Sequence, residues 1–146
     1  MFNRILVPVD LAEHGFSDQA LKQAVALLEK GGELYVQLVI PGFKMPIVEN
    51  YFPESARDEI RALARGELED FVIDALGQPK ETVDWHLILN EGSTVSSILE
   101  SSRRHQVDLI VMASHKGSDR ARDLLGSVSN RVAAQADAPV LIVKPN

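Results

Sequence analysis

A run of small and polar residues between positions 113 and 129 has the composition of a phosphate-binding loop that leads into a helix. Gly126 and Ser127 open the last helical pattern of the chain, and Ser129 follows two positions later. The first backbone amides of a helix have no partner inside it, and the helix dipole favours an anion at that end. The Ser127 and Ser129 hydroxyls can donate to the same anion. The pattern predicts either a phosphate site or an ordinary glycine turn with a serine N-cap.

Charged side chains near this run have two interpretations each. Lys116, Arg120 and Arg122 make the preceding loop basic within an acidic chain, so they are either partners of phosphate groups or a solvated surface. Asp10 follows a short apolar run near the start of the chain. Its carboxylate either accepts hydrogen bonds from a ribose or a base, helps to hold Mg²⁺, or only braces a loop or a helix start.

The common catalytic motifs are missing from the sequence. It contains no Gly-x-x-x-x-Gly-Lys-Ser/Thr, Gly-x-Gly-x-x-Gly or Gly-x-Ser-x-Gly pattern. Ser114 and His115 are neighbours at a strand end and point in different directions, so a hydrolytic triad with Asp10 is not expected. The histidines are scattered without ligand spacing, which predicts no transition-metal site; they are His14, His86, His105 and His115. Without an obvious base, we expect no enzyme beyond slow ATP hydrolysis.

Length and composition indicate one globular domain over residues 1–146. The chain is 45% hydrophobic and 25% charged, which is ordinary for a globular protein. Its net charge of −6 argues against binding to nucleic-acid backbones, whereas backbone amides can still bind a small anion. No apolar run is long enough to span a membrane, there are no cysteines, and the chain enters a strand at once, which leaves no room for a signal peptide. These features together predict a cytoplasmic protein.

Apolar patterns predict five strands that alternate with four helices. Short apolar or alternating runs predict strands over residues 5–9, 34–40, 82–89, 107–113 and 140–143. Helical periodicity covers residues 16–28, 60–75, 94–105 and 124–136. We expect Gly31-Gly32 to stop the first helix, Ser55 and Asp58 to form a capping box for the second, and Ser93 or Thr94 to cap the third.

The character of each strand indicates its place in the sheet. The first and fourth strands are continuously apolar and therefore central, whereas the third alternates with polar residues and is an edge. Alternating strands and helices form a doubly wound α/β fold, a parallel sheet with helices on both faces, here in the order 3-2-1-4-5. Ligands bind this fold outside the carboxyl ends of the strands where the order reverses, between strands 1 and 4. That position is flanked by Asp10 and by the loop after Ala113.

Two segments raise questions that the fold class leaves open. Residues 140–143 form an edge strand of four consecutive apolar residues, which predicts pairing with the same strand of a second chain in a two-fold homodimer. Residues 43–53 form the longest loop, which either packs over a helix end or covers a ligand.

The whole chain resembles the universal stress protein family. The resemblance is carried by residues 4–10, by residues 107–115, by residues 124–132 with their Gly126-Ser127 pair, and by residues 138–143. It implies an adenine nucleotide alpha hydrolase-like sheet and a homodimer through the last strand. Members that bind ATP carry Gly-x-x-Gly, nine residues, then Gly-Ser/Thr. Here Ala113 and Lys116 replace the first two glycines, while Gly117 stands one place late.

By position, the resemblance implies an ATP site in three parts. Pro8, Val9, Asp10 and Val39 would lie near the adenine and ribose. If the site holds Mg²⁺, Asp10 would be its contact. Met112, Ala113, Ser114, Lys116 and Gly117 would surround the ribose and phosphates. Gly126, Ser127, Val128 and Ser129 would hold the phosphates. The function implied is a dimeric, ATP-binding regulatory protein whose nucleotide state is read by an unidentified protein partner; the alternative is a nucleotide-free dimeric stress protein.

Overall fold

The computed structural model describes residues 1–12, 15–40, 51, 53–77, 83–114 and 127–144. A parallel sheet is built from β1 (Phe2–Val9), β2 (Leu28–Ile40), β3 (Asp84–Glu91), β4 (Leu109–Ala113) and β5 (Val140–Val143), in the order β3-β2-β1-β4-β5. The predicted fold class and strand order are confirmed. None of the helices in the described part of the chain combines the length and the apolar character needed to cross a membrane.

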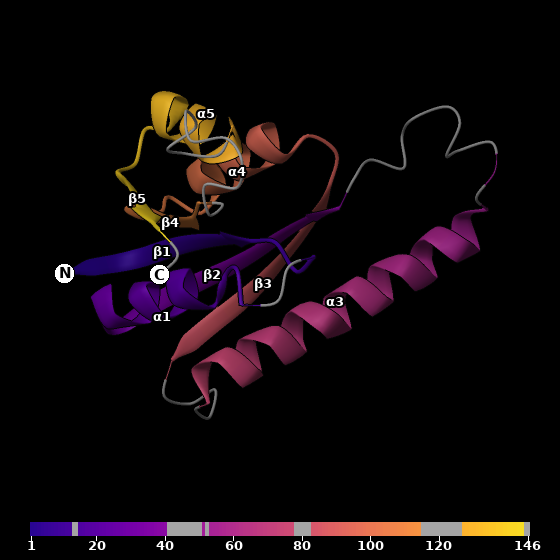
Figure 1. Cartoon of the computed structure of the whole chain (residues 1–146), viewed down its shortest axis with the longest axis horizontal. Helices are drawn as coiled ribbons and strands as arrows, with labels where there is room; N and C mark the ends of the chain where they lie inside the picture. The colour runs from indigo at the N-terminus through magenta and orange to yellow at the C-terminus, as the bar shows by residue number, and fades with distance from the viewer. Residues whose placement is uncertain (13–14, 41–50, 52, 78–82, 115–126, 145–146) are drawn as a thin grey trace.

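Helices cover both faces of the sheet (Figure 1). One face packs against α1 (Asp18–Leu27) and α3 (Glu54–Leu76), and the other against α4 (Thr94–Arg104) and α5 (Ser127–Gln135). Alternate residues of a central strand enter opposite cores. Ile5 and Val7 of β1 lie in the α1/α3 core, and Leu6 lies in the α4/α5 core; all three are fully buried. The continuous apolar runs are explained by burial on both faces.

The ends of the first helix and second strand differ from the prediction. Helix α1 ends at Leu27, and β2 begins at Leu28, where it pairs with Phe2. Gly31 and Gly32 therefore lie inside β2 and do not stop the helix, so that prediction is wrong. They lie in an irregular stretch where the register jumps from Phe2↔Leu28 to Arg4↔Glu33. Gly31 has a φ of 84°, and a Cβ on Gly32 would lie 2.8 Å from the Asn3 carbonyl oxygen, so the irregularity requires glycine.

The start of α3 also corrects a prediction. Pro53 is the N-cap, and its carbonyl oxygen accepts from the Arg57 amide at 3.1 Å. Ser55 already lies within the first turn, and Asp58 pairs with Arg61, so the capping box is absent. By contrast, Ser93 is the N-cap of α4, one of the two caps expected there. Gly77 ends α3 in the left-handed conformation.

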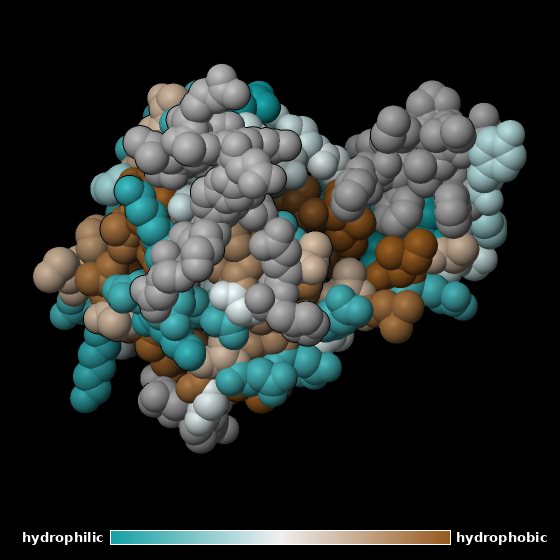
Figure 2. All heavy atoms as spheres, in the orientation of Figure 1, coloured by the Kyte–Doolittle hydropathy of each residue, from teal (hydrophilic) through white to brown (hydrophobic). Residues whose placement is uncertain are grey.

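Helix α3 is only partly packed on the sheet. Its buried residues are Leu68 and Val72, both in the second half, and the first half extends beyond the sheet (Figure 1). Leu63 and Ile73 are 69% and 48% exposed, and Figure 2 shows apolar surface over this helix. The stability of the domain therefore comes from the two cores at the sheet.

Candidate functional site

The carboxyl ends of β1 and β4 meet at the position where the strand order reverses. These strands pair through Ile5↔Leu109 and Leu6↔Ile110, so the residues that follow them leave the sheet side by side. Asp10 follows β1, and Ser114 follows β4. Ser114 is 2% exposed, and its amide donates to the carbonyl oxygen of Val143 on β5 at 3.0 Å. Two of the predicted site residues are thus brought to one edge of the sheet.

Asp10 braces the turn in which it lies. Its Oδ1 accepts from the Ala12 amide at 2.9 Å, and its own amide donates to Ser17 Oγ at 2.9 Å. The loop-bracing interpretation of this carboxylate is therefore observed. It leaves room for ligand binding, because a carboxylate offers about four lone-pair sites.

The other predicted residues of the sheet face different ways. Met112 is buried in the α4/α5 core, whereas Ala113 and Val9 pack at the α1/α3 core. Val39 is half-buried near the end of β2, where it pairs with Asn90 of β3. Pro8, which pairs with Gln37, is also half-buried. A ligand at this edge would meet the strand ends and not the side chains of every residue named from the sequence.

Helix α5 spans Ser127–Gln135 in the described part of the chain, and the residues directly before Ser127 lie outside it. Ser127 is exposed, Val128 packs at the α4/α5 core, and Ser129 is 2% exposed. Of the two serines, Ser127 is therefore the one whose hydroxyl reaches the surface. Three predicted site residues lie outside the described residues, namely Lys116, Gly117 and Gly126.

A buried amide below the edge was missed by the sequence analysis. Gln37 of β2 is fully buried, and its two N–H donors are shared among Asn90 Oδ1 at 2.6 Å, Ser101 Oγ at 2.8 Å and the Ser97 carbonyl oxygen at 3.2 Å from Nε2. These bonds tie β2 to β3 and α4. The Gln37 Oε1 has no hydrogen-bond partner among the described residues. The available signal was a polar residue within an apolar strand, because a buried amide usually makes at least one hydrogen bond.

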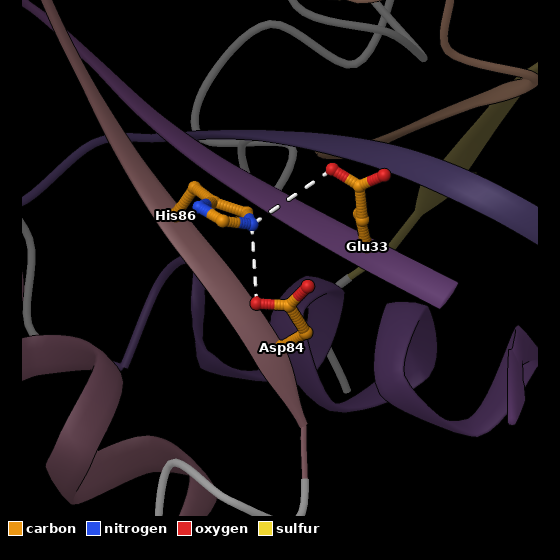
Figure 3. A group of neighbouring side chains, drawn as sticks. All are labelled: Glu33, Asp84 and His86. Atoms are coloured by element: carbon orange, nitrogen blue, oxygen red, sulfur yellow. Dashed lines mark ion pairs between the residues drawn. The ribbon is translucent and has the colours of Figure 1, made fainter. Parts of the chain in front are cut away.

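A second group of polar side chains lies on the α4 face, at the start of β3 (Figure 3). His86 Nε2 lies 3.1 Å from Asp84 Oδ1 and 3.8 Å from Glu33 Oε2. The Tyr35 ring stacks between His86 and His105, with centroid distances of 5.3 and 4.5 Å. Tyr35 Oη donates to Glu33 Oε2 at 2.6 Å. This group contains two histidines that looked isolated in the sequence.

Local contacts shift the titration of this group. The hydrogen bond from Tyr35 holds the pKa of Glu33 below its usual value, and the charge of Arg4 adds to this effect. Burial, together with the bond to Glu33, raises the pKa of Tyr35 to about 12. Burial and the nearby Arg104 lower the pKa of His105. At neutral pH the group therefore holds an ionised Glu33 and a neutral Tyr35.

The chain and its fold have clear relatives. The model of the universal stress protein family matches residues 1–144. The chain belongs to the universal stress protein family. It is 32% identical to universal stress protein YxiE of Bacillus subtilis over 151 residues, which cover 99% of this chain and 100% of the relative. The solved structure of the hypothetical protein MJ0577 is 26% identical in sequence and superposes with a TM-score of 0.77. The match covers 100% of this chain and 98% of that protein's chain.

Two structural neighbours in this family contain bound nucleotides. One is a universal stress protein in complex with cAMP, which is 24% identical and covers 98% of this chain and 97% of its own, with a TM-score of 0.62. The other, from Archaeoglobus fulgidus, is in complex with dAMP and is 18% identical, covering 97% of both chains, with a TM-score of 0.63. At these identities the likeness shows that the two proteins share the fold of this chain.

Proposed function

We propose that this protein is a single-domain, cytoplasmic regulatory protein that binds ATP at the carboxyl edge between β1 and β4. The observation that carries the proposal is the meeting of Asp10 and Ser114 at the ends of adjacent parallel strands, in a fold that binds ligands at this position. The family membership and the cAMP and dAMP complexes of two neighbours support an adenine nucleotide as the ligand.

The proposed site uses residues in three positions. Pro8, Val9, Asp10 and Val39 lie toward the adenine and ribose. Met112, Ala113, Ser114, Lys116 and Gly117 form the strand-side part. Gly126, Ser127, Val128 and Ser129 form the helix side, where the dipole at the start of α5 favours phosphate. Asp10, with lone pairs left over from its turn, is the proposed Mg²⁺ contact. Since the proposed site contains no evident general base, we assign it binding and not fast hydrolysis.

Nucleotide retention and calorimetry test the proposal. Purified protein is expected to release material that absorbs at 260 nm on denaturation, and nucleotide-free protein is expected to give a saturable heat with Mg-ATP. No heat at about 1 mM Mg-ATP, which corresponds to a binding free energy weaker than about −4 kcal/mol, would contradict it. That result would favour the alternative, a nucleotide-free dimeric stress protein.

We further propose that the functional unit is a homodimer formed through β5. This strand is at the edge of the sheet, and Leu141 is 36% exposed. An apolar edge strand with free backbone groups favours pairing with a second copy. Sedimentation at micromolar concentration is expected to give the mass of two chains, and Leu141→Lys is expected to give that of one. A wild-type monomer at this concentration would disprove the dimer. In the proposed function, an unidentified protein partner recognises the nucleotide state of this dimer.

A further inference from the structure

Glu33, Asp84 and His86 bring one imidazole nitrogen and two carboxylate oxygens to the same point on the α4 face of the sheet (Figure 3). We propose that these three residues form a binding site for a divalent transition-metal ion of the Zn²⁺ type. The site is separate from the β1/β4 edge. The inference therefore does not depend on nucleotide binding.

The distances between the three ligand atoms suit a small metal ion. His86 Nε2 lies 3.1 Å from Asp84 Oδ1 and 3.8 Å from Glu33 Oε2, and all three atoms lie within 4.8 Å of one another. Bonds of about 2.0–2.2 Å to a tetrahedral Zn²⁺ place neighbouring ligand atoms about 3.4 Å apart. The first two separations lie on either side of that value. Small rotations of Asp84, which is 58% exposed, would close the third.

Strand pairing sets this arrangement, so it does not depend on a flexible loop. The register pairs Glu33 with Asp84 and Tyr35 with His86 on β2 and β3. Side chains two residues apart on a strand share a face, so Asp84 and His86 point the same way. Their neighbours Val83 and Trp85 belong to the opposite, α1/α3 core.

Surrounding groups orient the ligands from outside. The ring of Tyr35 stacks on His86 at 5.3 Å with an interplanar angle of 26°, which restricts rotation of the imidazole. The Tyr35 hydroxyl donates to Glu33 Oε2, and Arg4 Nε lies 3.5 Å from Glu33 Oε1. Because Arg4 takes the outer oxygen, Oε2 faces His86 and keeps a lone pair for a metal. Such outer contacts are typical of groups that hold metal ligands in place.

The donor set decides the class of metal. One imidazole with two carboxylates suits borderline divalent ions such as Zn²⁺, whereas Mg²⁺ and Ca²⁺ prefer oxygen alone. Glu33 and Asp84 place two carboxylates at this point, and of the two only Glu33 is paired with a lysine or arginine cation among the described residues, through Arg4, so a divalent cation is electrostatically favoured. The side chains are 33–58% exposed, so water would complete the coordination and the ion would exchange with solvent.

Calorimetry and NMR with ZnCl₂ test the proposal on the full chain. We expect one equivalent of Zn²⁺ to bind and to shift the imidazole nitrogen signals of His86. We expect His86→Gln and Asp84→Asn each to weaken binding at least about tenfold, because the loss of a group that only orients a metal ligand already costs about that much. Asp70→Asn on α3 is the matched control, since Asp70 is an exposed carboxylate on the other side of the sheet, and it should leave the affinity unchanged.

Two results would overturn the metal site. One is the absence of saturable binding up to about 1 mM Zn²⁺. The other is binding that leaves the His86 signals of the wild-type protein unshifted, because Zn²⁺ would then occupy another position. The NMR result needs no substitution, so a variant that fails to fold does not weaken the test. Retained Mg-ATP binding in His86→Gln would separate this site from the proposed nucleotide site.

Discussion

Replacing Gly126 by glutamate is expected to weaken Mg-ATP binding at least about a hundredfold. Gly126 directly precedes Ser127, the first residue of α5, where the proposed site holds the phosphates. Two unit charges about 4 Å apart near a protein surface interact by about 4 kcal/mol, and about 2.7 kcal/mol already corresponds to a hundredfold change in affinity. The added carboxylate would repel the phosphates and take their place at the helix amides. Calorimetry with Mg-ATP measures the change.

The control for this substitution is Gln135→Glu at the other end of α5. It adds the same charge at an exposed position, the last residue of the helix, and should leave the affinity nearly unchanged. An acidic residue at a helix start is favourable for the helix, so Gly126→Glu is not expected to lose binding through unfolding. Equal ATP affinity in both variants would show that the phosphates are not held at the start of α5.

Ile98→Ala is expected to lower the free energy of unfolding by about 2–5 kcal/mol. Ile98 of α4 is fully buried and lies in the same core as Leu6 of β1 and Ile110 of β4. Removing three methyl or methylene groups loses their burial and leaves a cavity between the helix and the central strands. Domains of this size are stable by about 5–15 kcal/mol, so the loss is a large fraction of the total. Urea unfolding at a fixed protein concentration measures it, since dimerisation would also contribute.

Leu63→Ala provides the matched control for the core substitution. Leu63 is also a large aliphatic residue on a helix, but it is 69% exposed on α3. Its replacement should change the free energy of unfolding by no more than about 0.5 kcal/mol. If Leu63→Ala were as destabilising as Ile98→Ala, the first half of α3 would have to be buried in solution, contrary to the structure.

The edge that carries the proposed nucleotide site could be predicted because its signals are local. The apolar run before Asp10 and the run before Ser114 each predict a buried strand that ends at a polar residue. Parallel strands bring such ends to one side of the sheet, so the strand order was enough to place both residues together. What the strand order could not predict was which core each side chain enters: Met112 lies in the α4/α5 core and Ala113 packs at the α1/α3 core.

The cluster of Glu33, Asp84 and His86 could not be predicted from the spacing of these residues in the sequence. Glu33 and His86 lie on different strands, and Asp84 and His86 are two positions apart without a further ligand nearby in sequence. They meet because β2 and β3 pair in one particular register, and a shift by one residue would turn His86 into the other core. The histidines are therefore scattered along the chain, whereas in space His86 lies beside two carboxylates.

The amino-acid sequence by itself determined the type and succession of the elements, the strand order and the family. Hydrophobic period and apolar runs are properties of neighbouring residues, so they need no knowledge of the fold. Only the tertiary structure decided where α1 ends and β2 begins, which groups the Gln37 Nε2 contacts and which charged residues face one another. Those features arise from backbone pairing and packing between distant segments, whose free energies outweigh the local preferences that mark helix ends and caps.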